Sequence, residues 1–337
     1  MSGALLPLAL AFLVSLATAG LVLRLGILDH PNARSNHVNP TPRGGGLGIV
    51  LGFLVALFFI PVAAPHDLAA LTGLALCTVL AAGLGFLDDL VTLSERLKFV
   101  CLALISLALA GMAGPVTELG LALPWLVGWL GSALFVFTLA NTVNFMDGSD
   151  GLMTAALIPA ALTLAWLAPG ATGLAALALA AALAGFAVWN APLMAARGKL
   201  FSGDVGSLGA AVILAGLALM WASNGPATSV WLVPLLVLPL LGDVLLTMAA
   251  RVKAGASPFV AHRSHAYQLL IAMGASHRKV AVIWGAMSLV CGALALLAAG
   301  LPPIAAPFVL LVAVLVFAVL HQRWRRLARA AGVETRQ

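Results

Sequence analysis

Long apolar runs, separated by short polar links, follow one another along almost the whole chain. A helix needs roughly 20 apolar residues to cross a bilayer core of about 30 Å, and each run is near that length. The pattern therefore predicts an all-α fold: a polytopic transmembrane helical bundle of about 11 spanning helices. The expected spans are residues 4–26, 45–63, 68–87, 98–113, 124–140, 151–167, 172–190, 206–223, 230–250, 280–299 and 304–321.

The basic residues are confined to every second link, which predicts the orientation of the bundle. Lys and Arg occur near residues 34–43, 96–98, 197–199 and 251–279 and again after the last span, whereas the links between these contain neither. Links rich in Lys and Arg stay on the cytoplasmic side. We therefore expect a periplasmic N-terminus and a cytoplasmic C-terminus, which an odd number of spans satisfies.

The composition excludes a soluble domain and limits the partners. Apolar residues make up 63% of the chain and charged residues 8%, whereas soluble domains carry about 25% charged residues. The net charge of +6 does not indicate nucleic-acid binding, because the basic residues are spread over short links as membrane topology requires. The three cysteines lie inside apolar runs without metal-site spacing, so we expect them to be packing residues.

No internal repeat, linker or second domain is visible between the runs. We expect a single transmembrane catalytic domain over residues 1–322 and a basic cytoplasmic tail over residues 323–337. The second run begins with three glycines, residues 44–46, and continues with Gly48 and Gly52. Such a stripe lets another helix approach closely. We interpret it as packing within the bundle, with a homodimer contact as the alternative.

Five aspartates lie at the cytoplasmic ends of predicted spans, in three different links. Ionisable groups at membrane depth are costly and mark functional paths. Five carboxylates on one face repel one another unless a cation or a basic partner is present. A hard ion such as Mg²⁺ prefers carboxylate and amide oxygens and keeps waters for a phosphate substrate, with Mn²⁺ as the alternative ion. The five are Asp88, Asp89, Asp147, Asp150 and Asp204.

The link between the fifth and sixth runs is the most informative one. Asn141, Asn144 and Asp147 recur every three residues, which puts them near one face of a helical turn. Gly148 and Gly151 then free the backbone to approach a ligand. A purely structural turn rarely needs two Asn and two Asp between apolar helices, so the pattern predicts a ligand-binding segment.

Two more links carry groups suited to phosphate. Phe201 and Asp204 precede the eighth run, where free N–H groups at the helix start could hold phosphate and Asp204 a metal; capping by Asp204 or Ser207 is the alternative. In the link over residues 251–279, Arg263 could clamp a diphosphate beside two histidines. Surface basic residues near anionic lipid are the alternative for that link.

Two further features are expected to support this face of the bundle. The link over residues 29–45 adds cations and a stiff turn containing Pro40 and Pro42. Asp243 lies about two turns inside the ninth span. We interpret Asp243 as structural support that pairs with Arg251 or with neighbouring backbone.

In this order, the motifs resemble those of the polyprenyl-phosphate N-acetylhexosamine-1-phosphate transferase superfamily, bacterial glycosyltransferase family 4. Its members include phospho-MurNAc-pentapeptide translocase and the enzymes that initiate O-antigen and enterobacterial common antigen. The match runs from residue 29 to about residue 270. The resemblance implies transfer of a sugar 1-phosphate from a UDP-sugar to undecaprenyl phosphate with release of UMP. It also implies a bacterial inner-membrane protein with a cytoplasmic active site.

The resemblance assigns roles to individual residues. Asp204 is expected to bind Mg²⁺ with Asn144, and Asp88 and Asp89 to belong to the catalytic centre. Asp88 is our candidate for accepting a proton from the lipid phosphate, while a covalent aspartyl-phosphate is left open. Asp150 falls where the family contacts uracil, Phe201 where a ring stacks on it, and residues 262–265 where diphosphate binds. The residues expected to bind substrate are Asn141, Asp147, Gly148, Asp150, Phe201, His262, Arg263 and His265.

One departure from the family pattern bears on the sugar. Several members have a His-rich cluster where residues 262–268 read His-Arg-Ser-His-Ala-Tyr-Gln. This version is similar to the O-antigen-initiating branch, which uses N-acetylated, often 6-deoxy, hexosamines. The expected partners are therefore a UDP-N-acetylhexosamine, undecaprenyl phosphate and membrane lipid.

Two other classes of function remain as alternatives. A transporter of a nucleotide-sugar or lipid would place its polar groups near the middle of the bilayer rather than at one surface. A catalytically silent scaffold would not need the Asn-Asn-Asp-Asp and Gly-Asp motifs together.

Overall fold

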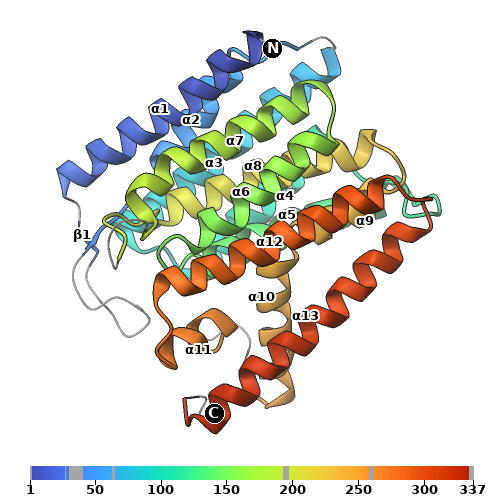
Figure 1. Ribbon diagram of the computed structural model, residues 1–337. Coiled ribbons are helices and arrows are strands. Elements are labelled where there is room, and N and C mark those ends of the chain that lie inside the picture. The colour runs from blue at the N-terminus through green and yellow to red at the C-terminus, as the bar shows by residue number, and fades with distance from the viewer. Residues whose placement is uncertain are drawn as a thin grey trace.

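The computed structural model describes residues 2–26, 28–29, 41–62, 65–192, 197–257 and 262–333. Parts of two expected links, residues 30–40 with Pro40 and residues 258–261, lie outside the described residues, as does the end of the tail, residues 334–337. Within the described part, thirteen helices and one pair of two-residue strands form the chain (Figure 1). The helices are α1 Ser2–Leu25, α2 Leu47–Leu57, α3 Pro65–Val91, α4 Glu95–Ala113, α5 Trp125–Met146, α6 Leu152–Leu167, α7 Gly170–Asn190, α8 Asp204–Asn224, α9 Ser229–Leu236, α10 Leu238–Lys253, α11 Ala266–Ala272, α12 His277–Ala299 and α13 Ala305–Ala330.

The eleven predicted apolar runs all contain helix, and the all-α membrane fold is confirmed. Among the described residues, eight helices are long and apolar enough to cross a membrane, namely α1, α3, α4, α5, α7, α8, α12 and α13. The ninth predicted run is a pair, α9 and α10, bent by 76°. The runs at α2 and α6 form shorter apolar helices. The number of spans and the sides of the two termini stay predictions.

The bend between α9 and α10 has a cause in the sequence. Pro239 lies in the first turn of α10, where its missing N–H costs nothing, but it cannot continue the hydrogen bonds of α9. Pro234 lies inside α9 itself. The result is a helix, α10, that leaves the direction of the surrounding bundle (Figure 1). The sequence pattern alone predicted one straight span here.

Helix α8 lies at the centre of the bundle. About 94% of an apolar 18-residue stretch of α8 is buried, a larger share than in any other candidate span among the described residues. Small residues make this possible, because helices in lipid associate through close packing rather than through the hydrophobic effect. At Gly209 and Gly216 an added methyl group would meet Val50 and Leu74 at 2.5 Å.

The glycine stripe of the second run packs inside the chain, as expected. A methyl group at Gly48 would lie 2.5 Å from the carbonyl oxygen of Ser15, and one at Gly52 would overlap the carbonyl oxygen of Ala11, both on α1. The Ser15 hydroxyl donates a hydrogen bond to the carbonyl oxygen of Ala182 on α7, at 2.7 Å. Helices α1, α2 and α7 therefore form one tightly packed layer.

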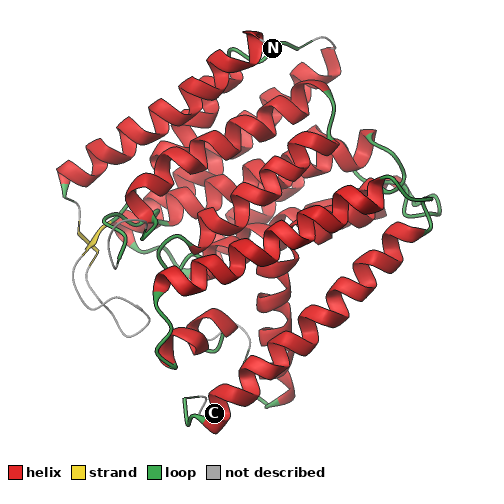
Figure 2. Cartoon of the chain, in the orientation of Figure 1, coloured by secondary structure: helices red, strands yellow, loops and turns green. Residues whose placement is uncertain are grey.

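A short antiparallel strand pair and several loops gather at one end of the bundle (Figure 2). Strand β1, Leu28–Asp29, pairs with β2, Thr41–Pro42. The segment after β2 continues along the loop before α8: the N–H of Phe201 donates to the carbonyl oxygen of Pro42 at 2.8 Å, and that of Gly45 to the carbonyl oxygen of Phe201 at 2.9 Å. Residues 42–46 are thereby held beside the start of α8.

Candidate functional site

The ends of three helices meet around one lysine. The Nζ of Lys98, in the first turn of α4, lies 2.8 Å from Oδ2 of Asp88 and 2.9 Å from Oδ2 of Asp204. Asp88 belongs to the last turn of α3, and Asp204 begins α8. All three side chains are mostly shielded from solvent, with exposed fractions of 15% to 26%. A cation thus joins two carboxylates that are 116 positions apart in the sequence, 88 and 204.

The adjacent carboxylates Asp88 and Asp89 point to different partners. Asp88 also accepts the backbone N–H of Leu93 at 2.7 Å, which fixes the carboxylate against the α3–α4 turn. Asp89 instead faces α8, where its Oδ2 lies 3.4 Å from the N–H of Val205. Arg43 reaches Asp89 as well, with Nη1 at 3.9 Å from Oδ1 and Nη2 donating to the Asp89 carbonyl oxygen. The different partners of Asp88 and Asp89 are consistent with different roles for the two carboxylates.

The start of α8 differs from the expectation of free N–H groups for phosphate. The N–H of Val205 contacts Asp89, and those of Gly206 and Ser207 donate to the carbonyl oxygen of Gly203. Neither Asp204 nor Ser207 caps the helix with its side chain. These three N–H groups already have acceptors within the protein, and phosphate binding at this helix start stays a prediction. Asp204 is left directed at Lys98 rather than at its own helix.

The link between α5 and α6 lies against this cluster. The Nδ2 of Asn144 donates to Oγ of Ser207 at 2.9 Å, and the amide also reaches the Asp204 carboxylate. Asp147 accepts a hydrogen bond from the Ser202 hydroxyl. Asn141 shares their face, but its Nδ2 donates back to the carbonyl oxygen of Phe137 on its own helix, at 2.8 Å.

Asp147 titrates far from the usual range of a carboxyl group. Burial, with the nearby charges of Asp204, Asp89 and Asp150, raises the pKa of Asp147 to about 8, against the lowering effect of the Ser202 hydrogen bond. Asp147 is therefore mostly protonated at neutral pH in the absence of a ligand. Lys98 pairs with Asp88 and Asp204 beside it, and Arg43 with Asp89.

Asp150 is buried, with 4% of its surface exposed, and is held by groups from two other links. Its Oδ2 accepts the N–H of Gly198 at 3.0 Å and lies 3.6 Å from Nδ1 of His277, at the start of α12. The same nitrogen accepts the N–H of Asp150 at 3.1 Å. Gly151 has a positive φ of 75° and donates its N–H to Oδ1 of Asn190 at 2.9 Å. The glycine predicted to free the backbone thus makes the sharp turn into α6.

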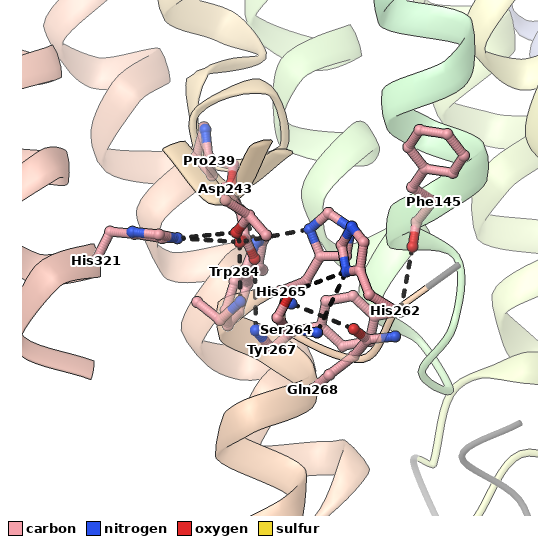
Figure 3. A network of polar contacts seen from close by, with 12 residues as sticks. Phe145, Pro239, Asp243, His262, Ser264, His265, Tyr267, Gln268, Trp284 and His321 are labelled. Carbon is pink, nitrogen blue, oxygen red and sulfur yellow. Dashed lines mark hydrogen bonds and ion pairs between the residues drawn. The ribbon is translucent and has the colours of Figure 1, made fainter. Parts of the chain in front are cut away.

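The histidine segment, residues 262–265, forms a neighbouring cluster around Asp243 (Figure 3). The rings of His262 and His265 lie 4.9 Å apart, and the His262 Nδ1 lies 2.9 Å from the Ser264 hydroxyl. Burial, followed by the charge of His265, lowers the pKa of His262 to about 4, so it is neutral at pH 7. Arg263, in the same segment, is exposed.

Asp243 supports this cluster, although its partner is not the expected arginine. Its Oδ1 accepts the N–H of Ala266 at 2.9 Å and lies 3.4 Å from Nε2 of His321 on α13. Arg251 instead donates to the carbonyl oxygen of Ser257 at 2.8 Å. Asp243 is fully buried. It therefore holds the beginning of α11 through the backbone, which is the second of the two pairings expected from the sequence.

Sequence reasoning missed several polar residues of the site. Lys98 was used only as a marker of topology and Arg43 only as one of the cations of its link, and Ser202, Asn190 and His277 carried no signal of their own. Their partners lie between 10 and 127 positions away in the sequence. The only available signal was that Lys98 lies one turn into the helix that follows the Asp-Asp pair.

The donor set fits a hard divalent cation held by few protein ligands. Asp204 offers its carboxylate, the side-chain amide of Asn144 lies beside it, and the carboxylate of Asp88 lies on the same lysine. Among the described residues, no group of three or more His, Cys, Asp or Glu side chains forms a closed metal cage. Mg²⁺ usually binds through one or two carboxylates and completes its shell with water and substrate phosphates. The carboxyl groups outnumber the two cations, Lys98 and Arg43, so the site suits a further cation, and a bound divalent ion would in turn attract an anion.

Comparisons with known proteins agree with this chemistry. Residues 71–222, which include Asp88, Lys98, Asn144 and Asp204, match glycosyl transferase family 4. The chain is 28% identical over 282 residues to an undecaprenyl-phosphate alpha-N-acetylglucosaminyl 1-phosphate transferase of Yersinia pestis, covering 77% of this chain and 74% of that one. It is 29% identical to a decaprenyl-phosphate N-acetylglucosaminephosphotransferase of Mycobacterium tuberculosis, covering 78% and 73%. The chain is thus similar to polyprenyl-phosphate hexosamine-1-phosphate transferases, and its residues 71–222 match glycosyl transferase family 4.

Proposed function

We propose that this membrane protein transfers N-acetylhexosamine 1-phosphate from a UDP-sugar to undecaprenyl phosphate and releases UMP. The general reaction, transfer of a sugar 1-phosphate to a polyprenyl phosphate, is supported by the names of its relatives. The single observation that carries the proposal is the meeting of Asp88, Lys98 and Asp204 from three helices. Such a cluster at a helix end suits a lipid phosphate and a soluble nucleotide that meet at the membrane surface.

The proposed step is an in-line phosphoryl transfer. An oxygen of the lipid phosphate attacks the sugar-bearing β-phosphorus, a new P–O bond forms, and the bond from that phosphorus to UMP breaks. Charge on the diphosphate is the main obstacle, and enzymes of this kind lower the barrier by positioning and electrostatics. When bound, Mg²⁺, or Mn²⁺ as the alternative, supplies positive charge to the phosphate oxygens.

The residues of the chain take separate parts in this proposal. Asp204 and Asn144 would hold the metal. Lys98, which pairs with Asp88, would contact the lipid phosphate. Asp88 accepts the proton of a lipid phosphate that enters in its monoprotonated form, and Asp89 orients the start of α8. A covalent aspartyl-phosphate on Asp88 or Asp89 is the competing sequence of events, and a burst of UMP without lipid would support it.

The nucleotide-sugar is proposed to lie along the link between α5 and α6 and the histidine segment. Asp150 and Phe201 would contact the uracil, and His262, Arg263 and His265 the diphosphate. Asn141, Asp147 and Gly148 would line the site between the uracil and the diphosphate. We propose an N-acetylated, often 6-deoxy, hexosamine donor and a role in initiating O-antigen or another surface polysaccharide, since residues 262–268 have the pattern of that branch. The protein would act in a bacterial inner membrane, with this site facing the cytoplasm.

The direct test uses the purified protein, undecaprenyl phosphate, Mg²⁺ and a panel of UDP-N-acetylhexosamines, with mass spectrometry of the lipid. Asp204→Ala should abolish product while the protein still inserts in the membrane. Asp67→Ala, at the opposite end of α3 from Asp88, is the matched control and should keep activity. Full transfer by Asp204→Ala would remove the metal assignment. Uptake of labelled UDP-sugar into vesicles without lipid product would favour a transporter instead.

A further inference from the structure

Tyr267, the only tyrosine of the chain, is buried where four helices meet. It lies in α11, directly after the histidine segment, and 1% of its surface is exposed. Its hydroxyl donates to the carbonyl oxygen of Phe145, in the last turn of α5, at 3.1 Å (Figure 3). Its ring packs edge-to-face on Trp284 of α12, with centroids 6.4 Å apart. Tyr267 therefore points away from solvent and into the protein.

The hydroxyl of Tyr267 also occupies the space above Gly148. A methyl group added at Gly148 would overlap the Tyr267 oxygen. Gly148 follows Asp147 at the start of the turn between α5 and α6, so only a glycine leaves room for the tyrosine there. One side chain thus makes two contacts with the end of α5 and its turn, a hydrogen bond and a close fit.

The start of α11, which carries Tyr267, is also anchored from a second side. Asp243 accepts the N–H of Ala266 at 2.9 Å and that of Tyr267 at 3.4 Å. Thr247 and His321 hold Asp243 in turn, at 3.1 and 3.4 Å. A second contact joins the same segments, because the His265 ring stacks on Phe145 with centroids 6.4 Å apart. The start of α11 is therefore fixed to α10 and α13 on one side and to α5 on the other.

We infer that Tyr267 is a positioning residue that holds the histidine segment in register with the turn carrying Asp147 and Asp150. The inference rests on the proposed function, in which these two segments bind the two ends of one nucleotide-sugar. A small shift between them would weaken the hold on the donor. It would leave the lipid phosphate, which meets Asp88 and Lys98, largely unaffected.

Tyr267→Phe removes the hydroxyl and leaves the ring in place. A hydrogen bond of this kind contributes a factor of roughly 3 to 10. The KM for the UDP-sugar should therefore rise about 3- to 10-fold, with the KM for undecaprenyl phosphate unchanged. A merely structural role would lower the amount of folded enzyme and hence the apparent kcat, with both KM values unchanged. That second result would overturn the inference.

A double mutant tests the contact with Gly148 separately. Gly148→Ala should raise the KM for the UDP-sugar, and adding Tyr267→Phe to it should recover part of that loss, because the overlapping oxygen is gone. Losses that simply multiply would contradict the inference, since residues in contact are expected to be coupled. The dissociation constant of UMP, measured by calorimetry for the wild type, the two single variants and the double variant, gives the same comparison without turnover. It therefore separates a failure of this inference from a failure of the proposed reaction.

Trp129→Phe provides the matched control. Trp129 donates its ring N–H to the carbonyl oxygen of Leu107 at 3.0 Å, so this change also removes one hydrogen bond from a partly buried aromatic side chain to the backbone. It lies on the same helix as Phe145 but roughly 24 Å away along its axis, at 1.5 Å per residue. The variant should keep both KM values. An equal rise in its KM for the UDP-sugar would mean that any loosening of α5 suffices, and the special role of Tyr267 would be lost.

Discussion

At the scale of single residues, the balance of charge around Lys98 explains how three carboxylates can lie together. Lys98 bridges Asp88 and Asp204, and Arg43 reaches Asp89. Partly buried carboxylates repel one another strongly without such partners. Lys98 thus has a structural part and, in the proposed reaction, a part toward the lipid phosphate.

Replacing Lys98 with methionine keeps the length of the side chain and removes its charge. Transfer should fall roughly 10- to 100-fold, because a mostly shielded pair of carboxylates loses its shared cation. The measurement is initial-rate production of lipid-linked sugar at saturating substrates. Arg96→Met removes an exposed charge from the same first turn of α4 and should be nearly neutral. Equal activity of the two variants would contradict the role of Lys98.

The raised pKa of Asp147 gives a pH dependence with a definite sign. The folded protein keeps this proton up to about pH 8, whereas the unfolded chain releases it near the ordinary value of 3.8. Between these values the folded state binds more protons, so its stability falls as pH rises and levels off above about 8. Asp147→Asn, which mimics the neutral acid, should lose this part of the decline.

Thermal unfolding of the ligand-free protein in detergent, measured from pH 5 to 9, tests that expectation. The melting temperature of the wild type should fall more steeply with pH than that of Asp147→Asn. Parallel curves for the two proteins would show that Asp147 titrates normally.

The sequence located these acidic residues but not their partners. Carboxylates among apolar runs stand out against the composition, which is why all five aspartates could be singled out. Lys98, Ser202 and His277 were not identified, because a single Lys, Ser or His at a helix end is ordinary. Their part in the site becomes visible only when the fold brings their hydrogen-bond partners close.

At the scale of helices, close contacts between backbones hold the site together. Gly46, just before α2, and Gly206, in the first turn of α8, lie so close that a methyl group on either would overlap the other's Cα. Gly85 on α3 likewise leaves room for the carbonyl oxygen of Asp204. The start of α8, which carries Asp204, is therefore fixed by backbone contacts on two sides.

Gly46→Ala should disturb this junction and lower both stability and transfer. Forcing a methyl group into a packed contact costs about 1–3 kcal/mol. A fluorescence-monitored melt gives the stability, and the rate of lipid product gives the activity. Gly83→Ala, on α3, is the control, since nothing lies within 4 Å of the added methyl group. Equal melting temperatures for the two variants would contradict the importance of the contact.

Helices were easier to predict from the sequence than their breaks. Apolar length is a strong signal, and the split between α5 and α6 appeared where polar residues and glycines interrupt it. The bend between α9 and α10 and the seven-residue helix α11 were not predicted. Pro239 indicates the bend only once it is known to lie in the first turn of a new helix. Helix α11 is fixed by Asp243, which lies 23 positions before Ala266.

At the scale of the whole molecule, the described polar links meet at one end of the bundle rather than being spread along its depth. The positive-inside pattern predicts that this end faces the cytoplasm. A nucleotide-sugar made in the cytoplasm could then reach the site without crossing the membrane.

Single cysteines placed in a cysteine-free variant test this orientation. Leu121→Cys lies in an outer link and Ala254→Cys in an inner one, and both positions are exposed. A membrane-impermeant maleimide applied to intact cells should label residue 121 and reach residue 254 only after lysis. The reverse pattern would place the site on the periplasmic side.

The nucleotide released in the reaction tests the central claim most directly. Wild-type protein, undecaprenyl phosphate, Mg²⁺ and an accepted UDP-N-acetylhexosamine should yield UMP and a lipid-linked sugar diphosphate in equal amounts, both lost in Asp204→Ala. Release of UDP with a lipid monophosphate sugar, or continuous UMP turnover without the lipid beyond a single burst, would contradict sugar-phosphate transfer at this site.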